Sequence, residues 1–308
     1  METPVVSLAV VILTHNEERH IGRALKALVT IAAEIFVIDS GSTDQTVAIA
    51  QAHSAVVLKH PFVNYALQFQ WALDHAPITA TWVMRLDADE IIESDLAEVI
   101  AKQLPTLGSD VAGINLKRKH IFLGRWIRHG GRYPLVLLRI WRRGQGRIEN
   151  RWMDEHMIVW GGRCVTIEGG FADHNLNDLT FFTDKHNKYA TREAIDRLNK
   201  TFRLFAGDGA VLSGASSTQA RLKRLLKEQI YNRLPSGVGP LGYFLWRYFG
   251  QLGFLDGREG LIYHILQGFW YRFLVEAKVR ELQRAVSHLH DPQEIKAELA
   301  RLTGLALD

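Results

Sequence analysis

Three acidic side chains follow a short apolar run in the segment Trp82–Glu90, WVMRLDADE. The apolar residues predict a buried strand, and Asp87, Asp89 and Glu90 come at its end. Two aspartates one residue apart, just beyond a strand, can converge on one divalent cation. Oxygen ligands favour a hard ion such as Mg²⁺ or Mn²⁺, which usually also holds substrate phosphates. An isolated D-x-D is short, and its alternative is a solvated acidic turn.

The elements that must position these acids alternate between strand and helix. We expect strands in 5–13, 35–38, 55–58, 81–86, 111–117 and 164–167, with helices in 21–28, 45–50, 64–75 and 94–104. This alternation predicts an α/β fold, Rossmann-like, with a mostly parallel sheet and helices on both faces. In such sheets ligands lie beyond the carboxyl ends of the strands. Asn16-Glu17, Asp39 and the Asp87/Asp89 pair all follow strand ends, and Asn16 is also suited to capping the next helix.

Composition and simple motifs exclude several classes of protein. The chain has 308 residues, 47% of them hydrophobic, a net charge of +4 and a single cysteine, Cys164. That cysteine excludes an internal disulfide and a zinc cluster, and fits a reducing compartment. The N-terminus lacks the features of a signal peptide, and no run of about 18 apolar residues predicts a membrane span. No glycine-rich dinucleotide or P-loop motif follows the first strand. We therefore expect a cytoplasmic chain.

Residues 117–151 carry eleven Lys or Arg against one acid, Glu149. One interpretation is a solvated basic face. The other is a surface for an anionic partner, either substrate phosphates or an acidic lipid leaflet. Aromatic residues are interleaved, but nothing matches an RNA- or DNA-binding module, so no nucleic-acid partner is expected.

Two further motifs carry groups that could do chemistry. Asp154-Glu155 could supply a general base, and the alternative is a surface turn. His174 could be a metal ligand or a histidine held by ordinary hydrogen bonds. Beyond about residue 176 the apolar period becomes helical, and we divide the chain into a catalytic domain, 1–206, and a C-terminal helical extension, 207–308. The aromatic-rich helices of the extension would contact a membrane surface, the catalytic domain or a second copy in a homodimer.

Taken together, the ordered segments resemble family 2 glycosyltransferases, which have the GT-A fold. The resemblance is to the branch of bacterial lipopolysaccharide core β-1,4-glucosyltransferase-like enzymes. It covers most of the chain, and the D-x-D alone would not establish it. The segments that carry it are LTHNEERHIGRAL (13–25), VIDSGSTDQT (37–46), LDADE (86–90), MDEHM (153–157), DHNLNDL (173–179), KHNKYATREA (185–194) and GFLDGREGLIY (253–263).

The resemblance implies a role for each matching residue. By position, Thr14, Asn16 and Glu17 match the segment that lies along the nucleoside, and Asp39 matches the acid that contacts the uracil or ribose. Asp87 matches the acid near the ribose and metal, and Asp89 matches the metal ligand, with His174 as an added ligand. Asp154-Glu155 matches the region of the catalytic base. Phe69 departs from the pattern, because relatives often carry an arginine there that is read as a diphosphate contact. The two acids of the base pair would point in opposite directions on an extended backbone, which leaves the choice between them open.

The implied activity is an inverting, metal-dependent hexosyltransferase. It would move a sugar from a nucleoside-diphosphate donor, a UDP-sugar, to a glycan or glycolipid acceptor such as lipopolysaccharide core. The implied location is the cytoplasm, with peripheral attachment to the inner face of the bacterial plasma membrane. Two alternatives remain: a nucleotidyltransferase with similar strand-end acids, and a non-catalytic module that binds anionic glycolipid or membrane.

Overall fold

The computed structural model describes residues 6–149, 156–204 and 237–307. The chain forms two compact units, of which the first runs to Leu176 and the second begins at Asn177. The helix α5 (Leu179–Phe202) therefore groups with the second unit. The functional division at 206/207 stays a prediction.

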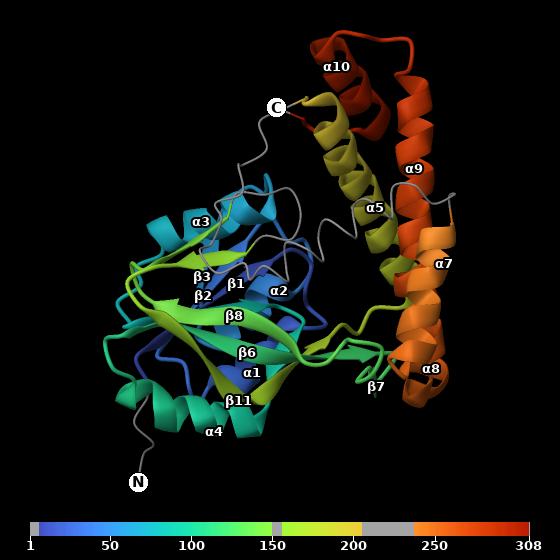
Figure 1. The fold of residues 1–308 in the computed structure, drawn as a ribbon. Coiled ribbons are helices and arrows are strands. Elements are labelled where there is room, and N and C mark those ends of the chain that lie inside the picture. The colour runs from blue at the N-terminus through green and yellow to red at the C-terminus, as the bar shows by residue number, and fades with distance from the viewer. Residues whose placement is uncertain (1–5, 150–155, 205–236, 308) are drawn as a thin grey trace. The chain divides into compact units, whose positions relative to one another are not determined.

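The first unit is built on a mixed sheet (Figure 1). Within the described residues it has nine strands in the order β3-β2-β1-β4-β8-β6-β11-β5, and β7 pairs with β6 at the side. Their bounds are β1 (Leu8–Thr14), β2 (Glu34–Asp39), β3 (Val56–Lys59), β4 (Trp82–Asp87), β5 (Glu90–Ile92), β6 (Val111–Phe122), β7 (Arg125–Trp126), β8 (Leu135–Arg142) and β11 (Arg163–His174).

The strand register brings the ends of three strands side by side. β1 is parallel to both β2 and β4, and β2 is parallel to β3. Thr14 lies opposite Asp39 on one side of β1, while Leu13 lies opposite Asp87 on the other. β8 runs antiparallel between β4 and β6, and β5 runs antiparallel to β11. The polar residues that follow β1, β2 and β4 therefore share one edge of the sheet.

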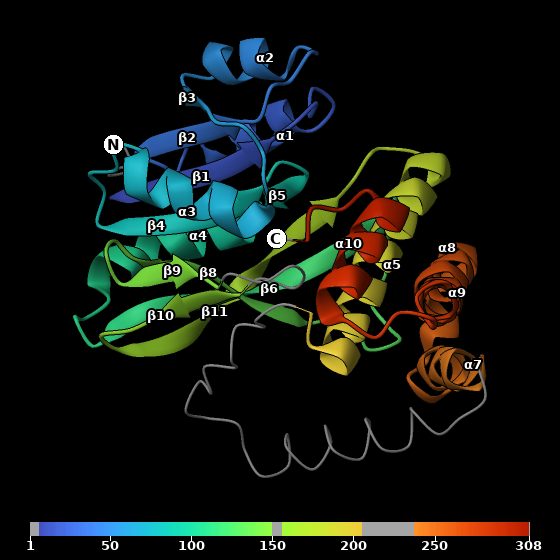
Figure 2. The same cartoon turned by 90° about the horizontal axis from the view of Figure 1, so that it is seen from above.

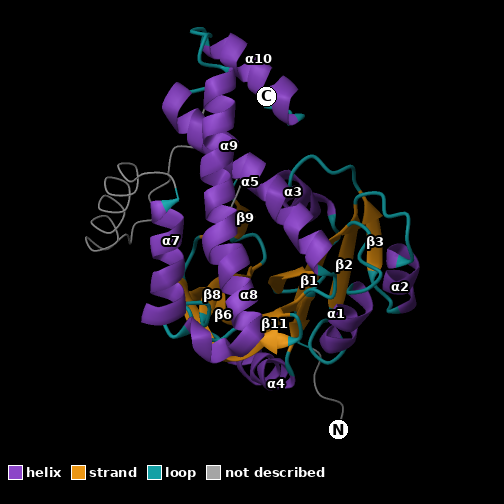
Figure 3. Cartoon of the chain, turned by 90° about the vertical axis from the view of Figure 1, so that its right-hand side faces the viewer, coloured by secondary structure: helices purple, strands orange, loops and turns teal. Residues whose placement is uncertain are grey.

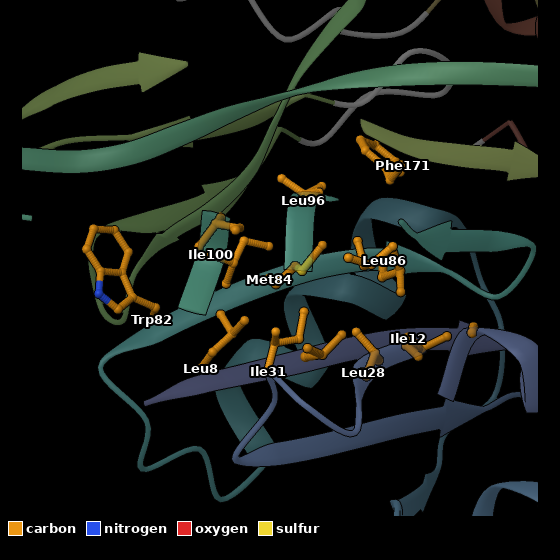
Figure 4. Packing of buried hydrophobic residues seen from close by; sticks show 14 of the residues in the cluster. Leu8, Ile12, Leu28, Ile31, Trp82, Met84, Leu86, Leu96, Ile100 and Phe171 are labelled. Atoms are coloured by element: carbon orange, nitrogen blue, oxygen red, sulfur yellow. The ribbon is translucent and has the colours of Figure 1, made fainter. Parts of the chain in front are cut away.

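Helices cover both faces of this sheet, as predicted (Figure 2). The helices α1 (Ile21–Leu28), α2 (Thr46–Ala52) and α4 (Ser94–Gln103) contribute to one core cluster, and α3 (Tyr65–His75) to the other. Alternate residues of β1 enter the two clusters, because successive side chains of a strand point to opposite faces. Leu8 and Ile12 pack in the cluster with α1 and α4 (Figure 4), as does Val10, whereas Ala9 and Val11 pack on the side of α3.

A two-stranded hairpin completes the core beneath α3. It pairs β9 (Gly146–Ile148) with β10 (Met157–Val159) in antiparallel register. Ile148 and Met157 are buried with Phe69 and Trp141. The hairpin thereby covers apolar surface on the second face of the sheet.

The second unit consists of helices in its described residues (Figure 3). These are α5, α7 (Val238–Leu245), α8 (Gly257–Tyr263), α9 (Tyr271–Ala285) and α10 (Pro292–Thr303). α5 packs along α9, and Leu198, Leu282 and Leu299 form part of the core that they share with α10. The predicted helical C-terminal region is confirmed. Among the described helices, none has the length and apolar character needed to cross a membrane.

Candidate active site

The carboxylate of Asp39 closes the loop that follows β2. Asp39 is buried, and its Oδ2 accepts hydrogen bonds from the backbone N–H groups of Gly41 (3.0 Å) and Ser42 (2.9 Å). Its Oδ1 accepts one from Thr14 Oγ1 at 3.2 Å. Gly41 has φ +91°, a conformation that glycine adopts without strain. Asp39 thus ties the ends of β1 and β2 together as well as shaping its own loop.

The loops after β1 and β2 bond to each other. Asn16 has φ 56°, its N–H donates to Ser42 Oγ at 2.8 Å, and its Oδ1 accepts from the N–H of Thr43 at 2.9 Å. The N–H of Glu17 donates to Thr46 Oγ1 at 2.7 Å. The expectation that Asn16 caps a helix was wrong, because α1 begins only at Ile21. Asn16 instead uses its tolerance of the left-handed region to join the two loops.

Asp87, the first acid of the D-x-D, is held by residues from α3 and β8. Its Oδ1 accepts from the Tyr65 hydroxyl at 2.6 Å, and its Oδ2 lies 3.3 Å from Nη2 of Arg139. Burial disfavours the charged form, but Arg139, Arg85 and the Tyr65 hydroxyl together hold the pKa of Asp87 well below its usual range. Asp87 is therefore an ionised carboxylate whose two oxygens already have partners within the protein.

Glu90 forms the centre of a buried ion-pair network. Its side chain is 0% exposed, and its Oε1 accepts from Arg139 Nη2 at 2.6 Å and from Arg118 Nη1 at 3.2 Å. Its Oε2 accepts the backbone N–H of Asp87 at 3.0 Å, which closes the turn between β4 and β5. Burial, reinforced by the charge of Asp87, raises the pKa of Glu90 to about 7 against the opposing pull of the two arginines. Glu90 therefore fixes the shape of the acidic turn from inside.

Asp89 and His174 are brought together by strand pairing. β5 pairs antiparallel with the end of β11, so that Glu90 lies opposite Asp173. The N–H of His174 donates to the carbonyl of Asp89 at 2.9 Å, and Asn175 Nδ2 donates to Asp89 Oδ2 at 2.9 Å. Burial and the nearby Arg23 lower the pKa of His174, so its imidazole is neutral at neutral pH. A half-buried carboxylate and a neutral imidazole therefore lie on adjacent strand ends.

A second histidine anchors the same segment to the first loop. His20 Nε2 accepts the backbone N–H of Leu176 at 2.9 Å, and its Nδ1 lies 2.6 Å from Oε2 of Glu17. Because Nε2 accepts, Nδ1 carries the proton and donates to Glu17. The Glu17 carboxylate is thus engaged with His20, which links the loop after β1 to the segment after β11.

Comparison with known proteins identifies the family. Residues 9–172, more than half of the chain, match the model of the family described as "Glycosyl transferase family 2". The chain belongs to glycosyltransferase family 2. It is accordingly a glycosyltransferase enzyme, and its first unit is the α/β sheet with helices on both faces that the sequence predicted.

Relatives match this glycosyltransferase over almost its full length. An uncharacterized glycosyltransferase of Rickettsia bellii is 36% identical over 299 residues, covering 93% of this chain and 90% of the relative. The "Lipopolysaccharide core biosynthesis glycosyltransferase LpsC" of Rhizobium meliloti is 28% identical over 283 residues, covering 90% of this chain and 93% of the relative.

Among solved structures, the chain is similar to glucosyl-3-phosphoglycerate synthase from Mycobacterium tuberculosis in complex with Mn²⁺, UDP and glucosyl-3-phosphoglycerate. The identity is 21% and the TM-score 0.29, and the match covers 39% of this chain and 45% of that chain. A likeness this low supports no conclusion about the ligands of this glycosyltransferase.

Many side chains of the basic stretch, residues 117–151, bond to other groups of this glycosyltransferase. Arg139, which is 4% exposed, and Arg118 belong to the Glu90 network. Arg142 donates to the backbone carbonyls of Val111, Leu107 and Gly108. Lys117 pairs with Glu168, Lys119 with Glu93, and Arg143 donates to the carbonyl of Ala80. These six side chains therefore have partners within the protein, and the choice between a solvated face and an anion-binding surface stays open for the stretch.

Sequence reasoning gave no role to Glu90, Arg139 or Tyr65, although Glu90 is visible as a third acid beside the D-x-D.

Phe69, at the position of the expected arginine, is fully buried and meets Trp141 edge-on with ring centroids 6.2 Å apart. Among the residues that the structure describes, no group of three or more His, Cys, Asp or Glu is arranged to hold a metal ion. Asp154 and Glu155 lie outside the described residues.

Proposed function

We propose that this glycosyltransferase moves a hexose from a UDP-sugar, with inversion at the anomeric carbon, to a glycan or glycolipid acceptor such as lipopolysaccharide core. The observation that carries the proposal is the alignment of polar strand ends: Thr14 beside Asp39, and Asp87 beside Leu13, on neighbouring parallel strands. Ligands of α/β sheets bind at such ends. The similarity to a relative named for lipopolysaccharide core biosynthesis supports the acceptor class.

The two joined loops would bind the nucleoside part of the donor. Asn16 and Glu17 are held by hydrogen bonds to Ser42, Thr43 and Thr46, which tie the loop after β1 to the loop after β2. A preorganised loop loses less conformational freedom on binding, which favours affinity. Asp39 acts here mainly by holding this pair of loops, and its carboxylate lies at their base.

The residues around Asp89 fit a divalent cation, Mg²⁺ or Mn²⁺. Asp89 and His174 offer one carboxylate and one neutral imidazole on bonded strand ends. Hard cations that bind nucleotides often take only one or two protein ligands and complete their shell with phosphate oxygens and water. Phosphate oxygens and water would have to complete the shell here, because the described residues hold no group of three or more such ligands. When bound, such an ion would compensate the negative charge that develops on the leaving diphosphate.

The chemical step needs a base on the acceptor side. In the proposed reaction the acceptor oxygen forms a bond to the anomeric carbon while the bond to the nucleoside diphosphate breaks, and the hydroxyl proton passes to a carboxylate. Asp154 and Glu155 are the candidates for that carboxylate, with Asp154 preferred. Asp154→Asn and Glu155→Gln should therefore differ in kcat, the true base losing about 10²–10⁴-fold. Normal rates in both variants would place the base elsewhere.

A screen of nucleotide sugars tests the class of reaction and the donor together. Purified protein with Mn²⁺ should release UDP from one UDP-sugar when a lipopolysaccharide-core acceptor is present. Asp89→Ala should abolish this turnover, while Asp74→Ala, which changes an exposed aspartate of α3, should leave it intact. Release of pyrophosphate instead of UDP would show a nucleotidyltransferase. Full activity of Asp89→Ala in the presence of EDTA would reject the role of the metal.

A further inference from the structure

Arg23 lies on α1, beside the two candidate metal ligands of the first unit. Its Nη2 donates to the backbone carbonyl of His174 at 2.9 Å, and its Nη1 lies 3.5 Å from Nδ1 of the same histidine. Burial lowers the pKa of Arg23 and the charge of Asp89 opposes that shift, so these two side chains interact. α1 also packs against β5, which begins at Glu90, directly after Asp89. One helix therefore brings a positive charge to the strand ends where Asp89 and His174 lie.

The partners of Arg23 differ from those of other arginines near the acidic turn. Arg118 and Arg139 both pair with the Glu90 carboxylate, so their charges are largely balanced within the protein. Among the residues that the structure describes, Arg23 makes no ion pair with a carboxylate, and its bonded partner is the neutral carbonyl of His174. A guanidinium stays protonated in proteins. Arg23 thus keeps an unbalanced positive charge at this edge of the sheet.

The guanidinium of Arg23 still has donors for a ligand. An arginine carries five N–H donors in a planar fork, of which one goes to the His174 carbonyl and another points toward Nδ1. The residue is half-buried, so part of its side chain reaches the surface. Forks of this kind bind phosphate oxygens in pairs. Arg23 is therefore held in place by the protein and is still able to contact a phosphate group.

The proposed leaving group carries more charge than one divalent ion can neutralise. UDP has a charge of about −3 at neutral pH, because a terminal phosphate loses its second proton at about pH 6. A divalent ion bound to the carboxylate of Asp89 brings a net charge of about +1. Preorganised positive groups at the point where charge develops make a large contribution to catalysis. A guanidinium beside Asp89 would supply such a group.

We propose that Arg23 binds the diphosphate of the donor and stabilises the charge that collects on it as the bond to the sugar breaks. The inference rests on the proposed function, because it assigns one more residue to the donor of that reaction. Arg23 would neither take nor give a proton in this role. The competing explanation is that Arg23 only ties α1 to the end of β11 and so holds His174 in place.

Binding of probes with and without phosphate separates these two roles. With Mg²⁺ present, Arg23→Met should bind UDP about tenfold to a hundredfold more weakly than the wild type, the loss expected for one charged hydrogen bond. Its affinity for uridine, measured by ligand-observed NMR, should not change, because uridine has no phosphate. Arg23→Lys keeps the charge without the fork and should fall between the two. Equal losses for UDP and uridine would overturn the proposal.

The matched control is Arg19→Met, which removes an exposed guanidinium just before α1. It should bind UDP and uridine as the wild type does. A loss of UDP affinity in Arg19→Met as large as that in Arg23→Met would overturn the proposal, because any positive charge on this surface would then have the same effect.

Two further probes do not depend on the identity of the nucleotide. Inorganic pyrophosphate with Mg²⁺ should bind more weakly to Arg23→Met than to the wild type. If that difference is found but the wild type binds no UDP, the contact is supported and the UDP-sugar donor is rejected. No pyrophosphate binding by the wild type, or equal binding by wild type and variant, would overturn the contact.

Mn²⁺ alone distinguishes a phosphate contact from support of His174. The EPR signal of the free ion should show that Arg23→Met binds Mn²⁺ at least as tightly as the wild type, because a neighbouring positive charge has been removed. Weaker Mn²⁺ binding by Arg23→Met would instead assign Arg23 to holding His174 and would overturn the proposal.

Discussion

The two units differ in the kinds of side chain that they bury and expose. The first unit buries charge: Glu90 and Arg139 are almost fully enclosed and pair at 2.6 Å. The second unit exposes apolar groups: Trp246 and Phe249 are more than half accessible. A buried ion pair contributes little net stability, because desolvation offsets the attraction, and exposed aromatic rings contribute none to folding. The fold therefore gains little net stability from either arrangement.

Breaking the buried network should have the largest effect on stability. Arg139→Met leaves the Glu90 carboxylate enclosed without its main partner, and removal of one member of a buried pair costs about 3–5 kcal/mol. We expect a correspondingly lower free energy of unfolding in urea. Arg163→Met removes an exposed partner of Asp110 and should leave the unfolding midpoint where it was.

A double variant separates the positioning of the D-x-D from the stability of the fold. Arg139→Met/Glu90→Met removes both charges, and should regain part of the lost free energy because the Glu90 carboxylate is no longer left enclosed without Arg139. If the network positions the D-x-D, this double variant should still need more Mn²⁺ for half-maximal turnover than the wild type. A double variant with wild-type metal dependence would reduce the network to a purely structural feature.

A substitution at Asp39 should have an intermediate effect on the free energy of unfolding. Asp39→Ala removes the carboxylate, so the backbone N–H groups of Gly41 and Ser42 and the hydroxyl of Thr14 lose their acceptor. An unsatisfied buried donor costs about 1–3 kcal/mol. We expect that loss in urea unfolding, together with weaker UDP binding in calorimetry, because the loops after β1 and β2 loosen. Asp74→Ala, at an exposed position, should change neither. Unchanged UDP binding despite lower stability would mean that the loop geometry does not determine donor affinity.

The sequence predicted the layered α/β fold because parallel strands covered on both faces are apolar throughout. The segments 35–38 and 81–86 match β2 and β4 closely. The predicted strands 111–117 and 164–167 were shorter than β6 and β11, which extend to Phe122 and His174. Their far halves carry charged residues such as Lys117 and Asp173, and a strand whose side chains pair with other charges shows no apolar pattern.

The candidate site was predictable where its residues are neighbours in the sequence. It was unpredictable where its residues come from distant elements that only the fold brings together. Asp87 and Asp89 are neighbours in the sequence, and a strand followed by acids is enough to find them. The partners Tyr65 and Arg139 come from α3 and β8, and only the sheet order brings them to Asp87. Arg139 could not be told apart from the other basic residues around it, since burial is a property of the fold and not of the residue type.

The smallest expected effect lies at Phe249, an exposed ring of the second unit, and it sharpens the contrast most. Phe249→Ala should change the free energy of unfolding by less than about 0.5 kcal/mol, because an exposed ring packs against little. Phe69→Ala, the same substitution in the core beneath α3, should cost about 3–5 kcal/mol by leaving a cavity beside Trp141. Parallel urea titrations measure both. A large loss for Phe249→Ala would mean that this ring packs against protein in solution.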